Sequence, residues 1–156
     1  MIVAAVFKSL FENVIFLSAF TSLCASQLTK MFIAIVTSKN KKIWETILAA
    51  IWSTGGMPSS HSAVVCSLTV SVGLTEGASS NLFVFCIVFT MVVLRDALGV
   101  RRAAGLQAKA LNTFGKLTAE KIGVEFQAVK EIQGHTPLEV AVGVILGISI
   151  AAGFCL

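Results

Sequence analysis

The chain has 156 residues, of which 56% are hydrophobic and only 13% are charged. Soluble domains average roughly 45–50% apolar and about 25% charged residues, so this composition excludes an ordinary water-soluble domain. The 12 Lys and Arg exceed the 8 Asp and Glu, which gives a formal net charge of +4, and two prolines are too few for a Pro-rich or collagen-like chain. We therefore expect a single integral membrane domain over residues 1–156.

Four apolar segments are long enough to suggest membrane spans, because a bilayer core about 30 Å thick requires about 20 residues of helix. They cover residues 14–36, 59–75, 82–100 and 138–156. The last contains Gly143 and Gly147, four residues apart, a spacing typical of helices that pack closely in lipid. The predicted fold is an all-α, polytopic membrane helix bundle with about four transmembrane helices and short interfacial helices.

Two loops have helical periodicity of their own. Residues 43–52 place tryptophans on one stripe, which favours an interfacial helix. Residues 117–132 have apolar side chains at helical spacing with charged residues between them, which predicts a second helix along the surface. The four cysteines lie singly inside apolar runs, so we interpret them as small buried hydrophobic residues rather than metal ligands or disulfides. We expect no cleaved signal peptide, because Lys8 is soon followed by Glu12.

The distribution of basic residues predicts the orientation of the chain. Lys39, Lys41 and Lys42 lie in the first loop, and most other Lys and Arg lie between residues 101 and 130. With four spans these two loops share one side of the membrane. Since cytoplasmic loops carry the Lys and Arg excess, we expect both loops in the cytoplasm and both termini outside.

Ionisable residues gather at the ends of the predicted spans on this same side. Such residues are functional candidates in a membrane chain, because burying them in lipid is costly. We interpret Asp96 beside Arg95 as a structural ion pair. The full set is Lys30, His61, Arg95, Asp96, Arg101, Arg102, His135 and Glu139.

Two glycine-containing turns precede predicted helices and carry the only two histidines of the chain. The stretch GGMPSSHSA places two hydroxyl groups and His61 at the start of one helix. The stretch GHTPLEV places His135 before Thr136, an expected N-cap. Helix N-termini and nearby cations favour an anion, so the two turns together predict a phosphate site with one histidine attacking and one donating a proton.

These residues also carry a family resemblance. The sequence PSSH at 58–61, followed by His135 and by an acid four positions later, resembles the type-2 phosphatidate phosphatase superfamily, which also includes vanadium haloperoxidases. Together with DALGVRRAAGLQA, the two histidine blocks resemble its small divergent branch. The resemblance covers nearly the whole chain.

The resemblance implies a role for each matching residue. His135 would be the nucleophile that forms a phosphohistidine, Glu139 would orient its ring, and His61 would be the general acid. The expected phosphate ligands are Lys30, Ser59, Ser60, Arg101, Arg102 and Lys130.

The chain departs from the superfamily pattern at several motif positions. Thr37 and Ser38 stand where an Arg-Pro pair is expected, and Val129 stands where an arginine precedes the nucleophile. Lys130 is adjacent, but a lysine does not reproduce bidentate phosphate binding by arginine. This leaves Arg101 and Arg102 as the guanidinium groups that could replace the missing one.

Several of these residues also have purely structural interpretations. The TPLE sequence fits a capping box, in which Glu139 bonds the backbone of Thr136, and we expect this role and the orientation of His135 to exclude one another. Ser59 or Ser60 could cap the second span. Lys30 could extend to the interface, and the arginines and lysines after residue 100 could contact anionic lipid.

Two functions from different classes follow. One is a membrane phosphatase that acts on a lipid or prenyl phosphate through His135. The other is a non-catalytic membrane protein, either a binder of lipid phosphate or a small transporter subunit. We expect membrane lipid and a phosphorylated lipid as partners, no nucleic acid, and no cofactor or metal.

The orientation can be tested by labelling single cysteines in a background without the native ones. We expect a membrane-impermeant thiol reagent to miss positions 40 and 118 in intact cells and to react at position 79. The reverse pattern would show that the phosphate site faces outward.

Overall fold

The computed structural model describes residues 2–38, 56–131 and 134–156, and all regular structure in these ranges is helical. The helices are α1 (Ile2–Glu12), α2 (Val14–Thr37), α4 (Ser60–Thr75), α5 (Asn81–Arg95), α6 (Arg101–Ile122) and α7 (Pro137–Cys155), with a π-helical turn, Asp96–Val100, between α5 and α6. The predicted interfacial helix at 43–52 and the first-loop lysines lie outside the described residues.

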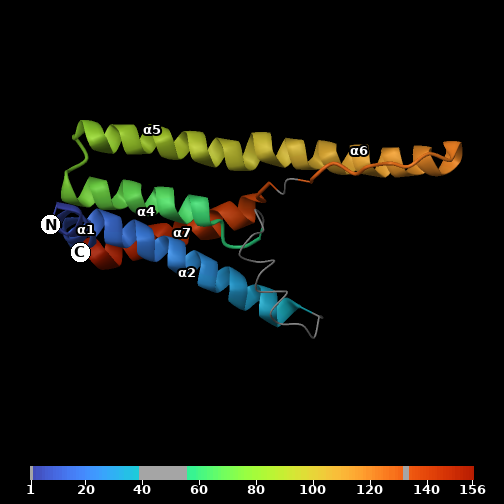
Figure 1. The fold of residues 1–156 in the computed structure, drawn as a ribbon. Coiled ribbons are helices and arrows are strands. Elements are labelled where there is room, and N and C mark those ends of the chain that lie inside the picture. The colour runs from blue at the N-terminus through green and yellow to red at the C-terminus, as the bar shows by residue number, and fades with distance from the viewer. Residues whose placement is uncertain (1, 39–55, 132–133) are drawn as a thin grey trace.

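The predicted membrane bundle is confirmed. Val14–Thr37, Asn81–Ile122 and Pro137–Cys155 are long and apolar enough to cross a bilayer, and α4 is a shorter apolar helix. The first, second and fourth predicted spans agree with α2, α4 and α7 to within a residue or two. Both termini lie at the end of the bundle where α4 ends and α5 begins (Figure 1).

Helix α4 is the centre of the bundle and packs against α2, α5 and α7. Small residues line its contacts, and the hydroxyl oxygens of Ser18 on α2 and Ser71 on α4 lie 2.6 Å apart. On α2, buried Ser22 and Ser26 continue the face that begins at Ser18. Four-residue spacing puts these serines on one side of the helix, so α2 presents a narrow polar seam to α4.

The predicted close packing of α7 is also observed. A Cβ atom placed on Gly143 would overlap the carbonyl oxygen of Ser59, and one on Gly147 would overlap that of Ala63. Helix α7 therefore lies against α4 backbone to backbone. Glycines permit such close contact between helices. In lipid this matters because apolar side chains gain no hydrophobic stabilisation by leaving the bilayer, so close packing drives helix association.

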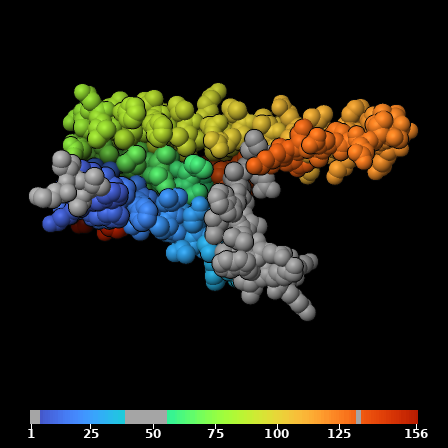
Figure 2. All heavy atoms as spheres, viewed as in Figure 1, coloured from blue at the N-terminus to red at the C-terminus, as the bar shows by residue number. Residues whose placement is uncertain are grey.

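The third predicted span does not end at residue 100. Helices α5 and α6 form one long rod with the π-helical turn inside it, and α6 extends beyond the rest of the bundle (Figures 1 and 2). The rod has 42 residues. At about 1.5 Å per residue it is roughly twice as long as the hydrocarbon core is thick, so the polar α6 must leave the membrane.

The surface helix predicted at 117–132 is wrong beyond Ile122. Gly123 ends α6 with a φ of +69°, a conformation that favours glycine. The chain then runs back along α6 without helical structure (Figure 1). The side-chain amide of Asn112 holds it there, since it donates to the carbonyl of Val129 and accepts from its N–H, each at 2.9 Å. A tertiary contact therefore overrides the local periodicity.

Two smaller expectations also change. Helix α1 was not predicted; Asn13, which caps α2 by accepting from the N–H of Phe16, separates it from α2. The cysteines are all free, but only Cys66 and Cys86 are buried, whereas Cys24 is exposed and Cys155 is intermediate. In a membrane bundle an apolar run does not require burial in protein, because lipid solvates its outer face.

The glycine contact predicts a clear difference between two positions on α7. Gly147→Ala should destabilise the protein by about 1–3 kcal/mol, because the added methyl group has no room against α4. Thermal unfolding in detergent measures this loss. Gly153→Ala is the matched control, since a Cβ atom there meets open space. Equal effects of the two substitutions would contradict the packing.

Candidate functional site

The start of α4 is built by Ser59, which is fully buried. Its hydroxyl oxygen accepts the N–H of Ser62 at 3.4 Å and the hydroxyl of Ser62 at 2.9 Å. The predicted capping role is therefore confirmed for Ser59. Helix α4 begins at Ser60, and His61 is its second residue, so the imidazole stands at the N-terminal end of the helix.

The start of α7 is a complete capping box. The hydroxyl of Thr136 accepts the N–H of Glu139 at 3.3 Å, and Oε2 of Glu139 accepts the N–H of Thr136 at 2.9 Å. The same Oε2 lies 3.2 Å from Nδ1 of His135. The expectation that capping and histidine orientation exclude one another is wrong, because one carboxylate oxygen has lone pairs enough for both.

The other ring nitrogen of His135, Nε2, has no hydrogen-bond partner among the described residues. A carboxylate accepts only, so the hydrogen bond places the proton on Nδ1 and leaves Nε2 unprotonated in the neutral ring. His135 is only 4% exposed. The ring is thus held by its surroundings in one orientation.

Backbone contacts hold the two helix starts together. The N–H of Ser59 donates to the carbonyl of Glu139 at 3.0 Å, which ties α4 to α7. The N–H of His135 donates to the carbonyl of Ala97 at 3.3 Å, which ties it to the π-helical turn. Gly134 packs on the backbone of Arg102, where a Cβ atom would overlap. The site is therefore positioned by main-chain atoms of three elements.

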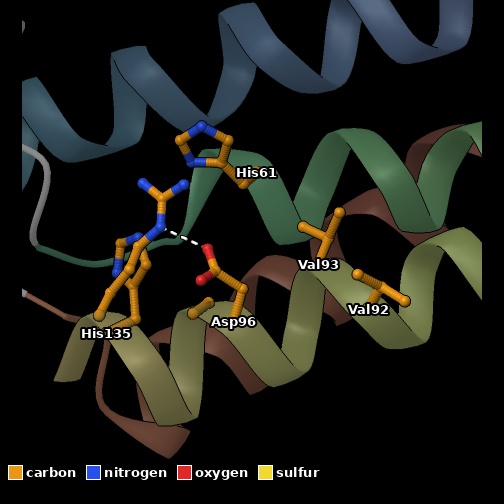
Figure 3. A pocket seen from close by; sticks show the side chains of 7 residues that line it. His61, Val92, Val93, Asp96 and His135 are labelled. Atoms are coloured by element: carbon orange, nitrogen blue, oxygen red, sulfur yellow. Dashed lines mark hydrogen bonds and ion pairs between the residues drawn. The ribbon is translucent and has the colours of Figure 1, made fainter. Parts of the chain in front are cut away.

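A cavity of about 250 Å³ lies where these elements meet. Figure 3 shows the side chains of His61, Asp96 and His135 reaching it from α4, the π-helical turn and the segment before α7. One wall is apolar and one is charged. The lining residues are His61, Val92, Val93, Asp96, Ala97, Arg101 and His135.

The π-helical turn places Arg101 in this cavity. In an α-helix, residues five apart point about 140° away from one another, since each residue turns the chain by about 100°. In the wider turn the N–H of Arg101 bonds to the carbonyl of Asp96, and Nε of Arg101 also donates to Oδ2 of Asp96. Asp96 therefore pairs with Arg101 and not, as expected, with Arg95. Such turns are frequent at functional sites.

Lys30 lies beside the cavity on α2 and is only 6% exposed. Its ammonium group is close enough for its charge to act on Glu139 and on His61. Arg101 and His135 also act electrostatically on His61. Helices α2, α4 and α6 and the segment before α7 thus each contribute one basic residue to this region.

Other predicted ligands lie apart from the cavity. Ser60 is buried but does not line it, and Arg102 and Lys130 are exposed on the α6 side. Asp96, in contrast, lines the cavity although the sequence indicated only a structural pair. The signal available for it was a carboxylate at the end of an apolar span. Within the described part of the chain, no group of three His, Cys, Asp or Glu could hold a metal ion.

Comparison with known proteins gives one family. The model of the "Divergent PAP2 family" matches residues 11–150. The chain is 36% identical over 150 residues to a Bacillus subtilis (strain 168) protein named "Uncharacterized membrane protein YuiD". The alignment covers 89% of this chain and 92% of the relative. No solved structure matches the chain significantly. The resemblance inferred from the histidine blocks is thereby confirmed, and this membrane protein belongs to the divergent PAP2 family.

Proposed function

We propose that this protein is a membrane phosphatase that hydrolyses a lipid or prenyl phosphate through a phosphohistidine on His135. The observation that carries the proposal is the orientation of His135 by Glu139, at a cavity that also holds His61 and Arg101. A nucleophile oriented by a carboxylate, with an acid and a cation across the cavity, is the arrangement that phosphoryl transfer requires.

The reaction has two steps. Nε2 of His135 attacks phosphorus, the bond between phosphorus and the lipid oxygen breaks, and His61 gives its proton to that oxygen. Water then attacks the phosphohistidine while His61 takes up a proton from it, which releases inorganic phosphate and restores both histidines. The Glu139 carboxylate stabilises the His135 ring while it carries positive charge.

The cations around the cavity bind the phosphoryl oxygens. Arg101 supplies the guanidinium in place of the arginine that Val129 replaces, and Lys30 adds charge from α2. The apolar wall at Val92 and Val93 is suited to the first carbons of a lipid chain. The Lys and Arg residues of α6 favour the cytoplasmic side for this site, because cytoplasmic segments carry the Lys and Arg excess.

Vanadate tests the phosphate site without requiring turnover. We expect millimolar vanadate to raise the melting temperature of the wild type, and His61→Ala, His135→Ala or Arg101→Gln to abolish the shift. Arg102→Gln removes the same charge one residue further along, outside the cavity lining, and should retain most of the shift. An unchanged melting temperature in the wild type would contradict a phosphate site.

Turnover tests the roles of His135 and Glu139. Purified protein in detergent should release phosphate from a panel of lipid phosphates, and His135→Ala should abolish this release. The variant should still bind the lipid phosphate itself, because the substitution removes mainly transition-state interactions. Glu139→Gln should lower kcat by about 10³–10⁴, because an amide does not stabilise a charged imidazole.

The stability of Glu139→Gln is the internal control. An amide oxygen still accepts the N–H of Thr136, so the melting temperature should barely change. Full activity in Glu139→Gln would contradict the orienting role of Glu139. Binding without any phosphate release across the panel would favour the non-catalytic lipid phosphate binder.

A further inference from the structure

The candidate phosphate cavity contains a carboxylate, which is unexpected in a site for an anion. Of the described residues that line it, His61, Arg101 and His135 can carry positive charge, and Asp96 is the one acid. A negative charge in this place weakens the attraction for any anion. Its presence therefore calls for a function that outweighs this cost.

The two oxygens of Asp96 have different surroundings. Oδ2 accepts the Nε–H of Arg101. Oδ1 accepts no hydrogen bond from any residue in the described ranges. The side chain is 38% exposed, and it faces the cavity together with His61 and His135 (Figure 3). One carboxylate oxygen is thus left to meet whatever molecule enters.

Arg101 lines the same cavity as Asp96 and offers its guanidinium to an anion there. Asp96 occupies only Nε of the guanidinium, and the two terminal nitrogens have no partner within the described part of the chain. Two parallel N–H groups of this kind bind two oxygens of a phosphate. The cavity measures only about 250 Å³ and Asp96 lines it as well, so an oxyanion bound there would share this space with the Asp96 carboxylate.

We propose that Asp96 makes this cavity selective for an oxyanion that carries a proton, a phosphate monoester, over unprotonated anions such as phosphate diesters and sulfate. This inference rests on the proposed function and specifies its substrate. A carboxylate only accepts, so a P–OH group can donate to it in a short, charge-assisted bond. An oxyanion without a proton instead places a negative oxygen against the Asp96 carboxylate, and the two repel one another.

The selectivity has a purpose in a bilayer. Bulk phospholipids carry phosphate diesters and surround the protein at high concentration, so cations alone would fill the cavity with their headgroups. A monoester has a second pKa near 6 and acquires the needed proton at small cost near neutral pH. Asp96 is then a specificity-determining residue that works by repelling the abundant competitor.

Small probe anions test this without a lipid chain. Binding of methyl phosphate, dimethyl phosphate and sulfate to the purified protein is measured by calorimetry in detergent near neutral pH. We expect the wild type to bind methyl phosphate at least about tenfold more tightly than the other two, a modest discrimination for a site built around a donated proton. In Asp96→Asn the ratio should fall to near one, mainly because dimethyl phosphate and sulfate bind more tightly.

Two further variants complete the experiment. Asp96→Glu keeps the carboxylate and should keep the preference for methyl phosphate, which guards against a fold defect in the amide variant. Glu76→Gln removes the same negative charge at the exposed, opposite end of α4 and should leave the ratio unchanged.

The outcomes separate this inference from the function beneath it. If the wild type binds all three anions equally, or if Asp96→Asn tightens all three by the same factor, the selectivity role is overturned while the phosphate site stands. If Asp96→Asn weakens binding of all three anions by the same factor, Asp96 only positions Arg101 and the inference is also wrong. If neither protein binds any anion, the proposed function itself fails.

Discussion

The backbone contact between α4 and α7 is the constraint on which the site depends. Gly143 and Gly147 let the two helices approach until main-chain atoms touch, and the N–H of Ser59 then reaches the carbonyl of Glu139. Because that bond joins the first turns of both helices, their N-terminal ends must lie side by side. The two histidines lie beside those first turns, so close packing in the membrane determines the distance between them.

Glu139 shows how one residue can serve fold and chemistry together. Its Oε2 completes the capping box of α7 and also bonds Nδ1 of His135. Each bond alone is a common local interaction, and a helix cap typically stabilises the folded state by about 1 kcal/mol. Sharing one oxygen couples them, because the cap fixes the carboxylate and the fixed carboxylate then orients the ring. The ring of His135, the proposed nucleophile, is thereby held by the same carboxylate that caps the helix.

The π-helical turn solves a different problem. A continuous α-helix through residues 81–122 would direct Arg101 well away from Asp96 and from the cavity. The wider turn brings the guanidinium beside Asp96, and the bond from His135 to Ala97 anchors the same turn to α7. The turn thereby places an arginine in the lining of the cavity in this chain.

Elements that depend on local chemistry could be predicted from the residues alone. Apolar run length located α2, α4 and α7, and the spacing of Gly143 and Gly147 indicated their close packing. The two histidine blocks identified the family, since their residues sit next to helix-start signals that are readable in order along the chain.

Features that depend on contacts between distant residues could not be predicted in this way. The periodicity of residues 117–132 is helical, yet Gly123 and the grip of Asn112 on Val129 turn that segment back along α6. The pairing of Asp96 with Arg101 instead of Arg95 occurs in a π-helical turn, and the carbonyl of Ala97 in that turn accepts the N–H of the distant His135. Side-chain spacing in sequence assumes regular helices, and the cavity is formed where the helix departs from regularity.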